Sequence, residues 1–419
     1  MNQLFHQMKQ SFRPVKLLSG LLLAGAIGCH RNDFPETPSG YREFAYVSNG
    51  GANTVSVLDL VYLRPDRTLQ VGIGPSGMAV NPVKSEVYVV NTGDKSSNGS
   101  VSVIDTDNNA VVATIGVHKQ PYFISVDTAG RRAYVANSGS NTVSVIDLDR
   151  RREIAVAGTG EQPGLARISA DMRSLVVTNR GSNSVSIFAV DPIPALDTSP
   201  NTPRQPPPLH FRSTFSGCPG ATDAVILPDS SKVFIACSGG HQIMAINLAA
   251  APDSWAAKQN PSLMTDRVLA LLDVGETPVH LAMKPDGGEL FVSNFASGSI
   301  SEISTYTNEV GSTYPIGNKP VHALVSGDNS ALWVANFGAD SLSLYSIDDG
   351  KLVSSLRTGS APDALAFSAD EHLLLAADAH SGDVSVIRTQ SKLGPSLFTI
   401  LPAGASPNAI VVKAIAAKN

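Results

Sequence analysis

One repeated pattern dominates the sequence. It recurs eight times between residues 41 and 415, with a period of about 42 residues. Each copy has a core such as residues 46–49 (Tyr-Val-Ser-Asn), and in seven copies an alternating segment such as residues 55–57 (Val-Ser-Val) starts nine residues after the core. The cores begin at Tyr46, Tyr88, Tyr134, Val176, Phe234, Phe291, Trp333 and Leu375. A proline stands thirteen residues ahead of six cores, at Pro75, Pro121, Pro163, Pro278, Pro320 and Pro362, and fifteen residues ahead of one, at Pro219.

Short, alternating, β-branched segments separated by Gly, Asn, Asp and Ser are typical of strands joined by tight turns. At this period they predict a β-propeller blade of four antiparallel strands. An α-solenoid is excluded because no helical period is visible. The segment after the proline would form the inner strand, the core the second strand and the Val-Ser-Val segment the third. A weaker stretch, such as residues 111–115 or 352–356, would form the fourth.

The two ends of the repeat region complement each other. The chain enters the first repeat at its core, with no proline-led strand before Tyr46, whereas residues 407–412 have the inner-strand pattern and no core after them. We expect this last segment to pair with the first repeat and close the ring, which removes exposed sheet edges. The sequence therefore predicts an all-β propeller of eight blades, or of seven if one degenerate repeat lies outside the ring.

The cores also carry a family resemblance. Residues 46–49, 88–91 and 134–137 read Tyr-Val-Ser-Asn, Tyr-Val-Val-Asn and Tyr-Val-Ala-Asn, so the repeat region resembles the YVTN-type β-propeller repeat proteins, a WD40-like architecture. The resemblance implies the fold across residues 41–419. It does not single out a function, because proteins that look like this include envelope binding proteins, and related propellers serve as lyases, lactonases and redox enzymes.

Residues 1–28 are predicted to be a signal peptide. Lys9, Arg13 and Lys16 precede an apolar run, residues 17–28, that is short for a membrane span and ends at Cys29. The small residues before Cys29 resemble a bacterial lipobox, which implies that this cysteine carries a lipid such as palmitate; the alternative is an ordinary signal peptide. Residues 29–40 would be a flexible tether. His30 follows the lipid cysteine where the inner-membrane retention signal would be Asp, so we expect an outer-membrane lipoprotein, facing the periplasm or the cell surface.

Net charge and cysteine content limit which binding partners and which cellular compartment the sequence predicts. The net charge of −5 becomes −8 when residues 1–28, with three cations and no acids, are removed, and this balance disfavours a general nucleic-acid surface. Cys218 and Cys237 remain, near the same end of one predicted hairpin. They would form a disulfide in an oxidising compartment or stay as two buried thiols. Insertions at residues 191–208, rich in proline, and 249–267 are candidate partner contacts or spacers, and we expect a monomer.

Inner strands begin at the face where second strands end, so side chains after the prolines and after the cores should gather around one channel mouth, the default binding site. The inner strands would contribute Tyr122, Phe123, His280, His322 and Asp363. The loops after the cores would contribute Arg180, His241, Phe295, Phe337, Asp378 and His380.

His280 and His322 occupy the same position, two residues after the proline, in consecutive repeats. Their rings could therefore approach one metal ion or one anionic ligand, with Asp363 of the next repeat as a third group. The alternative is a structural histidine inherited by duplication. No other cofactor is evident, since the sequence lacks Cys-x-x-Cys-His, a Gly-rich phosphate loop, His-Glu-x-x-His and Gly-x-Ser-x-Gly.

Two recurring polar positions are interpreted as structural. The core asparagine is predicted to form an Asx-type turn that ends the second strand. An aspartate five residues before the core is predicted to form the preceding hairpin turn, at Asp171, Asp229, Asp286, Asp328 and Asp370. Positions that are alike in most blades argue against catalysis, which needs asymmetry.

The favoured hypothesis from the sequence is a lipid-anchored, non-enzymatic module that binds an envelope protein or a small molecule. The alternative hypothesis is a lyase or lactone hydrolase with His280 and His322 at the channel mouth, although glutamates are scarce there. A third, redox association, would need an external cofactor, for which the sequence contains no ligand set.

Overall fold

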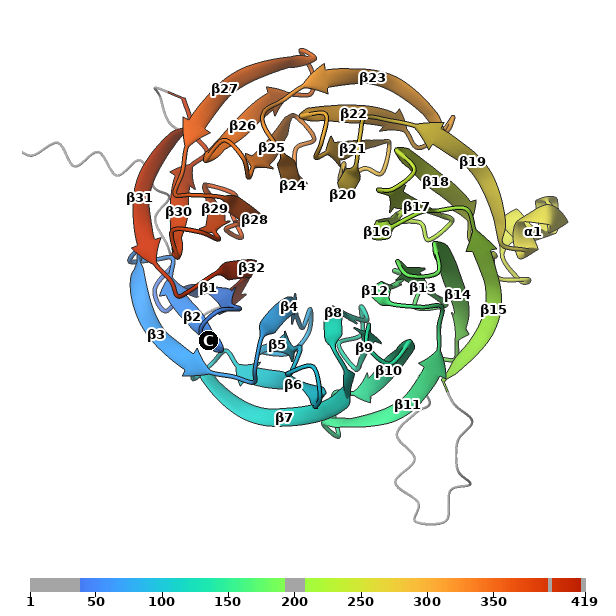
Figure 1. Cartoon of the computed structure of the whole chain (residues 1–419), viewed down its shortest axis with the longest axis horizontal. Helices are drawn as coiled ribbons and strands as arrows, with labels where there is room; N and C mark the ends of the chain where they lie inside the picture. Colours follow the sequence, from blue (N-terminus) through green and yellow to red (C-terminus); the bar gives the residue numbers. More distant parts are fainter. Residues whose placement is uncertain (1–37, 193–207, 391–393, 416–419) are drawn as a thin grey trace, which may run out of the picture. The chain divides into compact units, whose positions relative to one another are not determined.

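The computed structural model describes residues 38–192, 208–390 and 394–415. These residues form eight antiparallel sheets of four strands each, arranged as blades around a central axis (Figure 1). The prediction of an all-β, eight-bladed propeller is confirmed.

Blades 1 to 4 are formed by the first fifteen strands together with the last strand of the chain. Blade 1 consists of β32 (Pro407–Ile415), β1 (Arg42–Asn49), β2 (Thr54–Asp59) and β3 (Arg64–Gln70). Blade 2 consists of β4 (Pro75–Val80), β5 (Glu86–Asn91), β6 (Asn98–Asp105) and β7 (Ala110–Lys119). Blade 3 consists of β8 (Pro121–Val126), β9 (Arg132–Asn137), β10 (Thr142–Asp147) and β11 (Arg152–Gly158). Blade 4 consists of β12 (Pro163–Ile168), β13 (Ser174–Asn179), β14 (Ser184–Val190) and β15 (Leu209–Ser216).

The other four blades complete the ring. Blade 5 consists of β16 (Ala221–Ile226), β17 (Lys232–Cys237), β18 (Gln242–Asn247) and β19 (Arg267–Asp273). Blade 6 consists of β20 (Pro278–Met283), β21 (Glu289–Asn294), β22 (Ser299–Ser304) and β23 (Glu309–Pro315). Blade 7 consists of β24 (Pro320–Val325), β25 (Ala331–Asn336), β26 (Ser341–Ser346) and β27 (Lys351–Arg357). Blade 8 consists of β28 (Pro362–Phe367), β29 (Leu373–Asp378), β30 (Asp383–Arg388) and β31 (Ser396–Pro402).

Blade 1 closes the ring with strands from both ends of the repeat region. β1 pairs with β2 on one side and with β32 on the other, so that Tyr46 lies opposite Val57 and Val411. Figure 1 shows β32 at the centre of the ring beside β1. The prediction that residues 407–412 pair with the first repeat is confirmed, and the seven-bladed alternative is not adopted.

Strand direction gives the propeller two distinct faces. Each inner strand begins where the second strand ends, as Pro278 of β20 pairs with Asn294 at the end of β21. We call this end of the blades the mouth face and the opposite end the base face. The described chain starts at residue 38 and stops at residue 415 on the base face, because β1 is a second strand and β32 an inner strand.

Neighbouring blades pack through apolar side chains from both sides of each sheet. Tyr134 and Val145 of blade 3 lie in one cluster with Ala166, Leu175 and Val177 of blade 4, and all five are buried. Burial on both sides explains why the core segments are continuous apolar runs rather than strictly alternating ones. The blades therefore form rigid walls around the central channel.

The core asparagines do not form the predicted Asx-type turns. Nδ2 of Asn49 donates to the hydroxyls of Thr54 (3.0 Å) and Ser56 (3.0 Å), so the side chain bridges the second and third strands inside the blade. The equivalent pair of bonds is made by Asn91, Asn137, Asn179 and Asn294. The hairpin prediction, in contrast, is confirmed where Asp229 accepts from the backbone N–H of Ser231 (2.9 Å).

A glycine ahead of the inner strand makes room for this asparagine. A Cβ atom on Gly72 would lie 2.7 Å from the side chain of Asn91. The same contact recurs between Gly160 and Asn179, Gly275 and Asn294, and Gly317 and Asn336. Each glycine stands nineteen residues before its asparagine.

Blade 5 replaces the glycine and the asparagine by a disulfide. Cys218 and Cys237 are nineteen residues apart, their Cα atoms are 4.8 Å apart and their sulfur atoms are bonded. The third strand carries Met244 where blade 1 carries Ser56, and Met244 packs with both cysteines in one buried cluster. Of the two alternatives that the sequence left open, the disulfide is confirmed.

We expect reduction of this disulfide, or its replacement by two serines, to lower the free energy of unfolding by about 2 to 3 kcal/mol, because the bond closes a loop of about 20 residues. The pair Cys218→Gly and Cys237→Asn should not restore stability, since Met244 offers the new amide no hydroxyl. Adding Met244→Ser and Gln242→Ser should recover part of the loss. Urea unfolding of the three variants measures this, and full recovery with the first pair alone would contradict the argument.

The insertion in blade 5 forms α1 (Trp255–Gln259) and the 3-10 turn η1 (Pro261–Met264). Ser254 caps α1 by accepting a hydrogen bond from the backbone N–H of Ala257. Residues 193–207 of the other insertion, and Cys29 with the predicted signal peptide, lie outside the described residues. Within the described ranges no helix is long and apolar enough to cross a membrane.

Candidate functional site

Three polar side chains occupy the same position on three consecutive inner strands. Asp223, His280 and His322 each stand two residues after the first residue of β16, β20 and β24. Sequence reasoning missed Asp223 because Pro219 was taken as the marker of its strand. The strand begins at Ala221, which pairs with Cys237 as Pro278 pairs with Asn294. Counting fourteen residues back from the end of the core, which leads from Asn294 to His280, would have led from Cys237 to Asp223.

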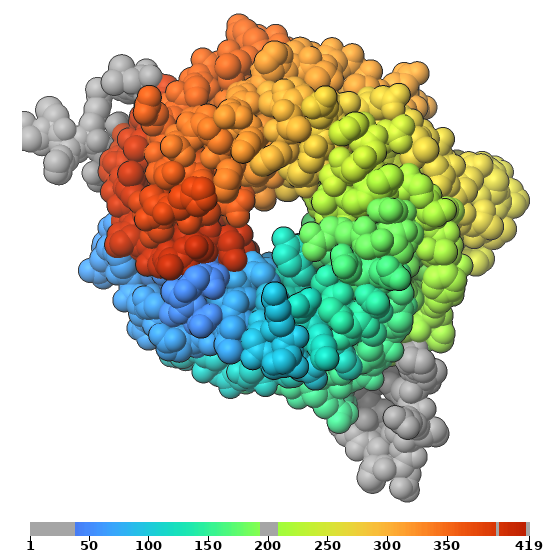
Figure 2. Space-filling model, in the orientation of Figure 1, coloured from blue at the N-terminus to red at the C-terminus, as the bar shows by residue number. Residues whose placement is uncertain are grey.

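The two histidines lie against each other on the channel wall, and Figure 2 shows that the ring is open at its centre. Their ring centroids are 4.0 Å apart and the ring planes are inclined by 33°. Nδ1 of His280 accepts a hydrogen bond from the backbone N–H of Ala323 (3.2 Å), so the neutral ring carries its proton on Nε2. Nδ1 of His322 is buried and has no hydrogen-bond partner within the described part of the chain.

Both imidazoles are held in the neutral form. Burial, together with the positive charge of Arg167, lowers the pKa of His280 to about 3. Burial also lowers the pKa of His322 well below its usual value, His280 adds to the effect, and the Asp223 carboxylate opposes it. Both rings remain partly exposed on the channel side. Because both rings are neutral and a ligand can reach them, each can accept or donate a hydrogen bond at neutral pH.

Asp223 connects the histidines to a cation on the neighbouring blade. It is buried, and its carboxylate accepts hydrogen bonds from the backbone N–H groups of Ala224 (2.8 Å) and Leu281 (2.9 Å). Arg167 of β12 lies 3.8 Å from it, and the guanidinium also stacks over Phe123, 5.2 Å from the ring centroid. Burial raises the pKa of Asp223, whereas the charge of Arg167 lowers it. Arg167 was also missed by the sequence analysis, because it stands alone, two residues further along its strand than the repeated position.

The predicted partner of the histidine pair, Asp363, lies one position away from theirs, on β28. Asp363 is half-buried. Burial raises the pKa of its carboxyl group, and the charge of His380 lowers that pKa. Within the described residues no three His, Cys, Asp or Glu side chains gather as a metal site would require. The structure thus brings His280 and His322 together, with Asp223 and Arg167 as their charged neighbours.

The remaining predicted residues line the rim of the mouth face in cation–aromatic and aromatic pairs. The contacts are Arg180 over Tyr122 (5.1 Å), Lys319 over Phe295 (5.6 Å) and Phe337 against His380 (5.3 Å between ring centroids). His241 accepts a hydrogen bond at Nδ1 from the backbone N–H of Thr277 (3.1 Å) and so holds a loop of the rim. Aromatic faces with adjacent cations suit an unsaturated or anionic ligand above the channel.

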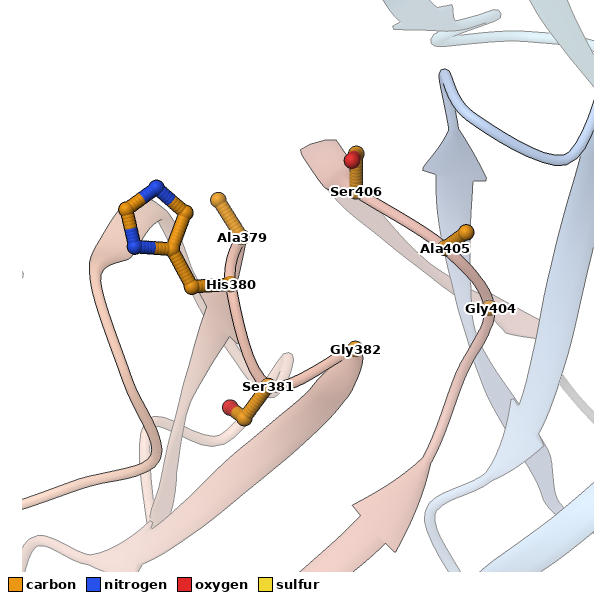
Figure 3. Close-up of a pocket in the computed structure, with 7 residues that line it drawn as sticks. All are labelled: Ala379, His380, Ser381, Gly382, Gly404, Ala405 and Ser406. Atoms are coloured by element: carbon orange, nitrogen blue, oxygen red, sulfur yellow. The ribbon is translucent and has the colours of Figure 1, made fainter.

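A shallow pocket of about 540 Å³ lies on the rim where the last blade meets the first. Two loops line it, residues 379–382 and residues 404–406, and Figure 3 shows His380 and Ser406 on its opposite sides. Asp378, just before the first loop, is buried instead of facing the mouth. Its Oδ2 accepts hydrogen bonds from the N–H (3.1 Å) and hydroxyl (2.7 Å) of Ser385. Asp378 thus takes the place of the core asparagine, and its assignment to the mouth is wrong.

Comparison with known proteins finds a partial match to a lactonase family model and similar β-propeller structures. A family model described as a lactonase with a seven-bladed β-propeller matches residues 304–399, which run from the end of β22 into β31 and contain His322. No curated protein matches the sequence. A β-propeller family is supported, whereas the YVTN family itself is not shown.

Solved structures agree on the fold. The dihydro-heme d1 dehydrogenase NirN, in complex with DHE, superposes with a TM-score of 0.69 at 15% identity, covering 90% of this chain and 76% of that one. The periplasmic gluconolactonase of Pseudomonas aeruginosa gives a TM-score of 0.55 at 17% identity, covering 90% of this chain and 99% of that one. A putative 6-phosphogluconolactonase of Bacteroides uniformis gives 0.57 at 15% identity, covering 89% of this chain and 100% of that one.

These matches correct the hypothesis that the sequence favoured. A non-enzymatic binding module is contradicted by the lactonase family match. The findings support the alternative, an enzyme with histidines at the channel mouth. The sequence favoured the wrong hypothesis because the known catalytic motifs are absent, glutamates are scarce on the predicted face, and two histidines in adjacent repeats can arise by duplication.

Proposed function

We propose that this protein is a hydrolase that opens lactone rings at the mouth of its channel. The observation that carries the proposal is the row of Asp223, His280 and His322 at one position of three consecutive blades, with Arg167 paired to its first member. The lactonase family match, which includes His322, supports it. We also propose that the enzyme acts in the cell envelope, held at the outer membrane by a lipid on Cys29.

Each side chain has a role that follows from its protonation and its partners. His322, which is neutral and partly exposed, would take the proton from water. His280, whose Nδ1 is occupied by a backbone N–H, would donate from Nε2 to the carbonyl oxygen of the lactone. Arg167 would attract the carboxylate that forms. Asp223 would act as a positioning residue that stabilises the positive charge passing through His322.

The reaction balances without a cofactor. Water loses a proton to His322 and its oxygen bonds to the carbonyl carbon, and the carbonyl oxygen becomes negative against Nε2–H of His280. The bond from that carbon to the ring oxygen then breaks. The ring oxygen leaves as an alkoxide and takes the proton from His322, which gives a hydroxy acid and restores the neutral histidine.

The test is proton release during ring opening of a panel of five- and six-membered lactones, above the spontaneous rate, by the full chain. The variant with His280→Ala and His322→Ala should lose roughly a hundredfold in rate. His372→Ala is the matched control, because His372 lies in a hairpin turn on the base face and bonds to Asp370. Wild-type protein that accelerates no lactone would overturn the proposal, as would an equal loss in the control.

A second candidate function is binding of a tetrapyrrole in the channel. It is supported by the two neutral imidazoles, which are suitable iron ligands, and by the eight blades, which exceed the seven of the lactonase family model. The NirN structure, whose title names a dihydro-heme d1 dehydrogenase, also has a higher TM-score than the two lactonase structures. A Soret band on adding haem that the double histidine variant loses, without any lactone hydrolysis, would favour this candidate.

A further inference from the structure

The base face carries the most exposed large apolar side chains among the described residues. Tyr306 is 88% exposed, Trp255 77%, Tyr62 71% and Val83 67%. The three aromatic residues lie in the connections between third and fourth strands of blades 6, 5 and 1, and Val83 lies in the hairpin between β4 and β5. All four connections are on the base face, so their exposure is not scattered over the surface at random.

The spacing of these side chains fits a flat partner. Blades 5 and 6 lie across the ring from blades 1 and 2 (Figure 1), so the apolar tips are separated by the width of the propeller and form no single patch. A compact protein partner needs a contiguous apolar area. A planar surface, in contrast, touches projecting tips around a ring at the same time.

The chemistry of the tips fits the interface of a lipid bilayer. Trp and Tyr have an apolar ring and a polar atom, and both are enriched where membranes meet water. Cations on this face are largely neutralised by acids, as in the pairs of Lys84 with Asp149 (2.6 Å) and of Arg151 with Glu86 (3.0 Å). Attraction to anionic lipids would therefore be weak, and apolar contact would dominate.

The course of the chain points the same way. The described residues begin at residue 38 on the base face, and the 37 residues before it include the apolar run 17–28 and Cys29. A lipid on Cys29, as proposed above, would leave about ten residues between the bilayer and the propeller, which reach at most roughly 35 Å. The face next to the membrane would be the one that carries the aromatic tips.

We propose that the base face docks on a phospholipid bilayer through Tyr62, Trp255 and Tyr306, with the histidine pair directed away from the membrane. The docked orientation leaves the mouth open to soluble ligands. The proposal does not depend on lactone hydrolysis, because it concerns the opposite face of the propeller.

Tryptophan fluorescence tests the orientation directly, because the chain has two tryptophans and Trp333 is buried. The full chain is bound to phosphatidylcholine vesicles with bromine atoms near the top of the acyl chains. We expect strong quenching in the wild type and little in the Trp255→Phe variant. Adding Tyr122→Trp to that variant places a probe on the mouth face, where we expect no quenching.

The affinity of the protein for vesicles gives a second test of the docking proposal. In a Cys29→Ser background, which blocks lipid attachment, replacing Tyr62, Trp255 and Tyr306 by serine should weaken vesicle binding roughly tenfold or more. Binding should change little between low and high salt. Phe211→Ser is the control, since Phe211 is 63% exposed but lies on the outer strand β15. Quenching of the mouth probe, absence of quenching at Trp255, or an equal effect of the control would overturn the proposal.

Discussion

Asp223→Asn should reduce kcat/KM for lactone hydrolysis by roughly a hundredfold to a thousandfold while the propeller stays folded. The new amide keeps one oxygen that can accept from Leu281 N–H, which Asp223 now does at 2.9 Å, and gives up only the bond from Ala224 N–H (2.8 Å). The variant loses the negative charge that faces Arg167 and His322. Proton transfer to His322 would then create a buried positive charge without compensation.

The pH profile separates this role from a structural one. Burial lowers the pKa of His322, and the negative charge of Asp223 partly offsets that effect. Replacing Asp223 by asparagine removes the offset, so the pKa of His322 should fall further. Because protonation of His322 would stop the reaction, the acid limb of kcat/KM should move to lower pH while the maximum rate falls. Asp229→Asn, in the hairpin at the other end of β16, is the matched control and should change neither quantity. A loss of rate with an unchanged acid limb would contradict the role assigned to Asp223.

The repeat determined the fold almost completely, because every blade solves the same packing problem with the same residues. Strand order, ring closure by residues 407–412 and the face on which His280 and His322 meet follow from spacing alone. Residues that depart from the repeat were harder to place. Asp223 was missed because its strand starts two residues after Pro219, and Asp378 was misplaced because side-chain direction at the core end depends on the glycine that packs against it. Arg167 has no equivalent in other blades and therefore left no periodic signal.

Asp378→Asn should stabilise the protein at pH 8 by about 2 to 4 kcal/mol. Asp378 takes the place of the core asparagine, and Asp383 takes the place of the hydroxyl residue five positions later. The pKa of Asp378 is raised to about 7: burial and then the hydrogen bond and charge of Asp383 raise it, and the hydrogen bonds from Ser385 oppose them. The native state therefore holds a proton on Asp378 over a range of pH in which the unfolded chain has released it.

The sign of the pH dependence follows from this difference. Between about pH 4 and pH 7 the native state binds more protons than the unfolded state, so the free energy of unfolding falls as pH rises, and above about pH 7 the contribution is lost. Asp378→Asn removes this titrating group and supplies an amide that can donate to Asp383, so the fall should become shallower, and the raised pKa values of Asp223 and Asp363 account for what remains. Asp383→Ser restores the hydroxyl found in the other blades and removes a group that raises the pKa of Asp378. In this variant the free energy of unfolding should still decrease with pH, but at lower pH than in the wild type. Urea unfolding across this range checks both variants, and a fall after Asp378→Asn that is as steep as in the wild type would contradict the raised pKa assigned to Asp378.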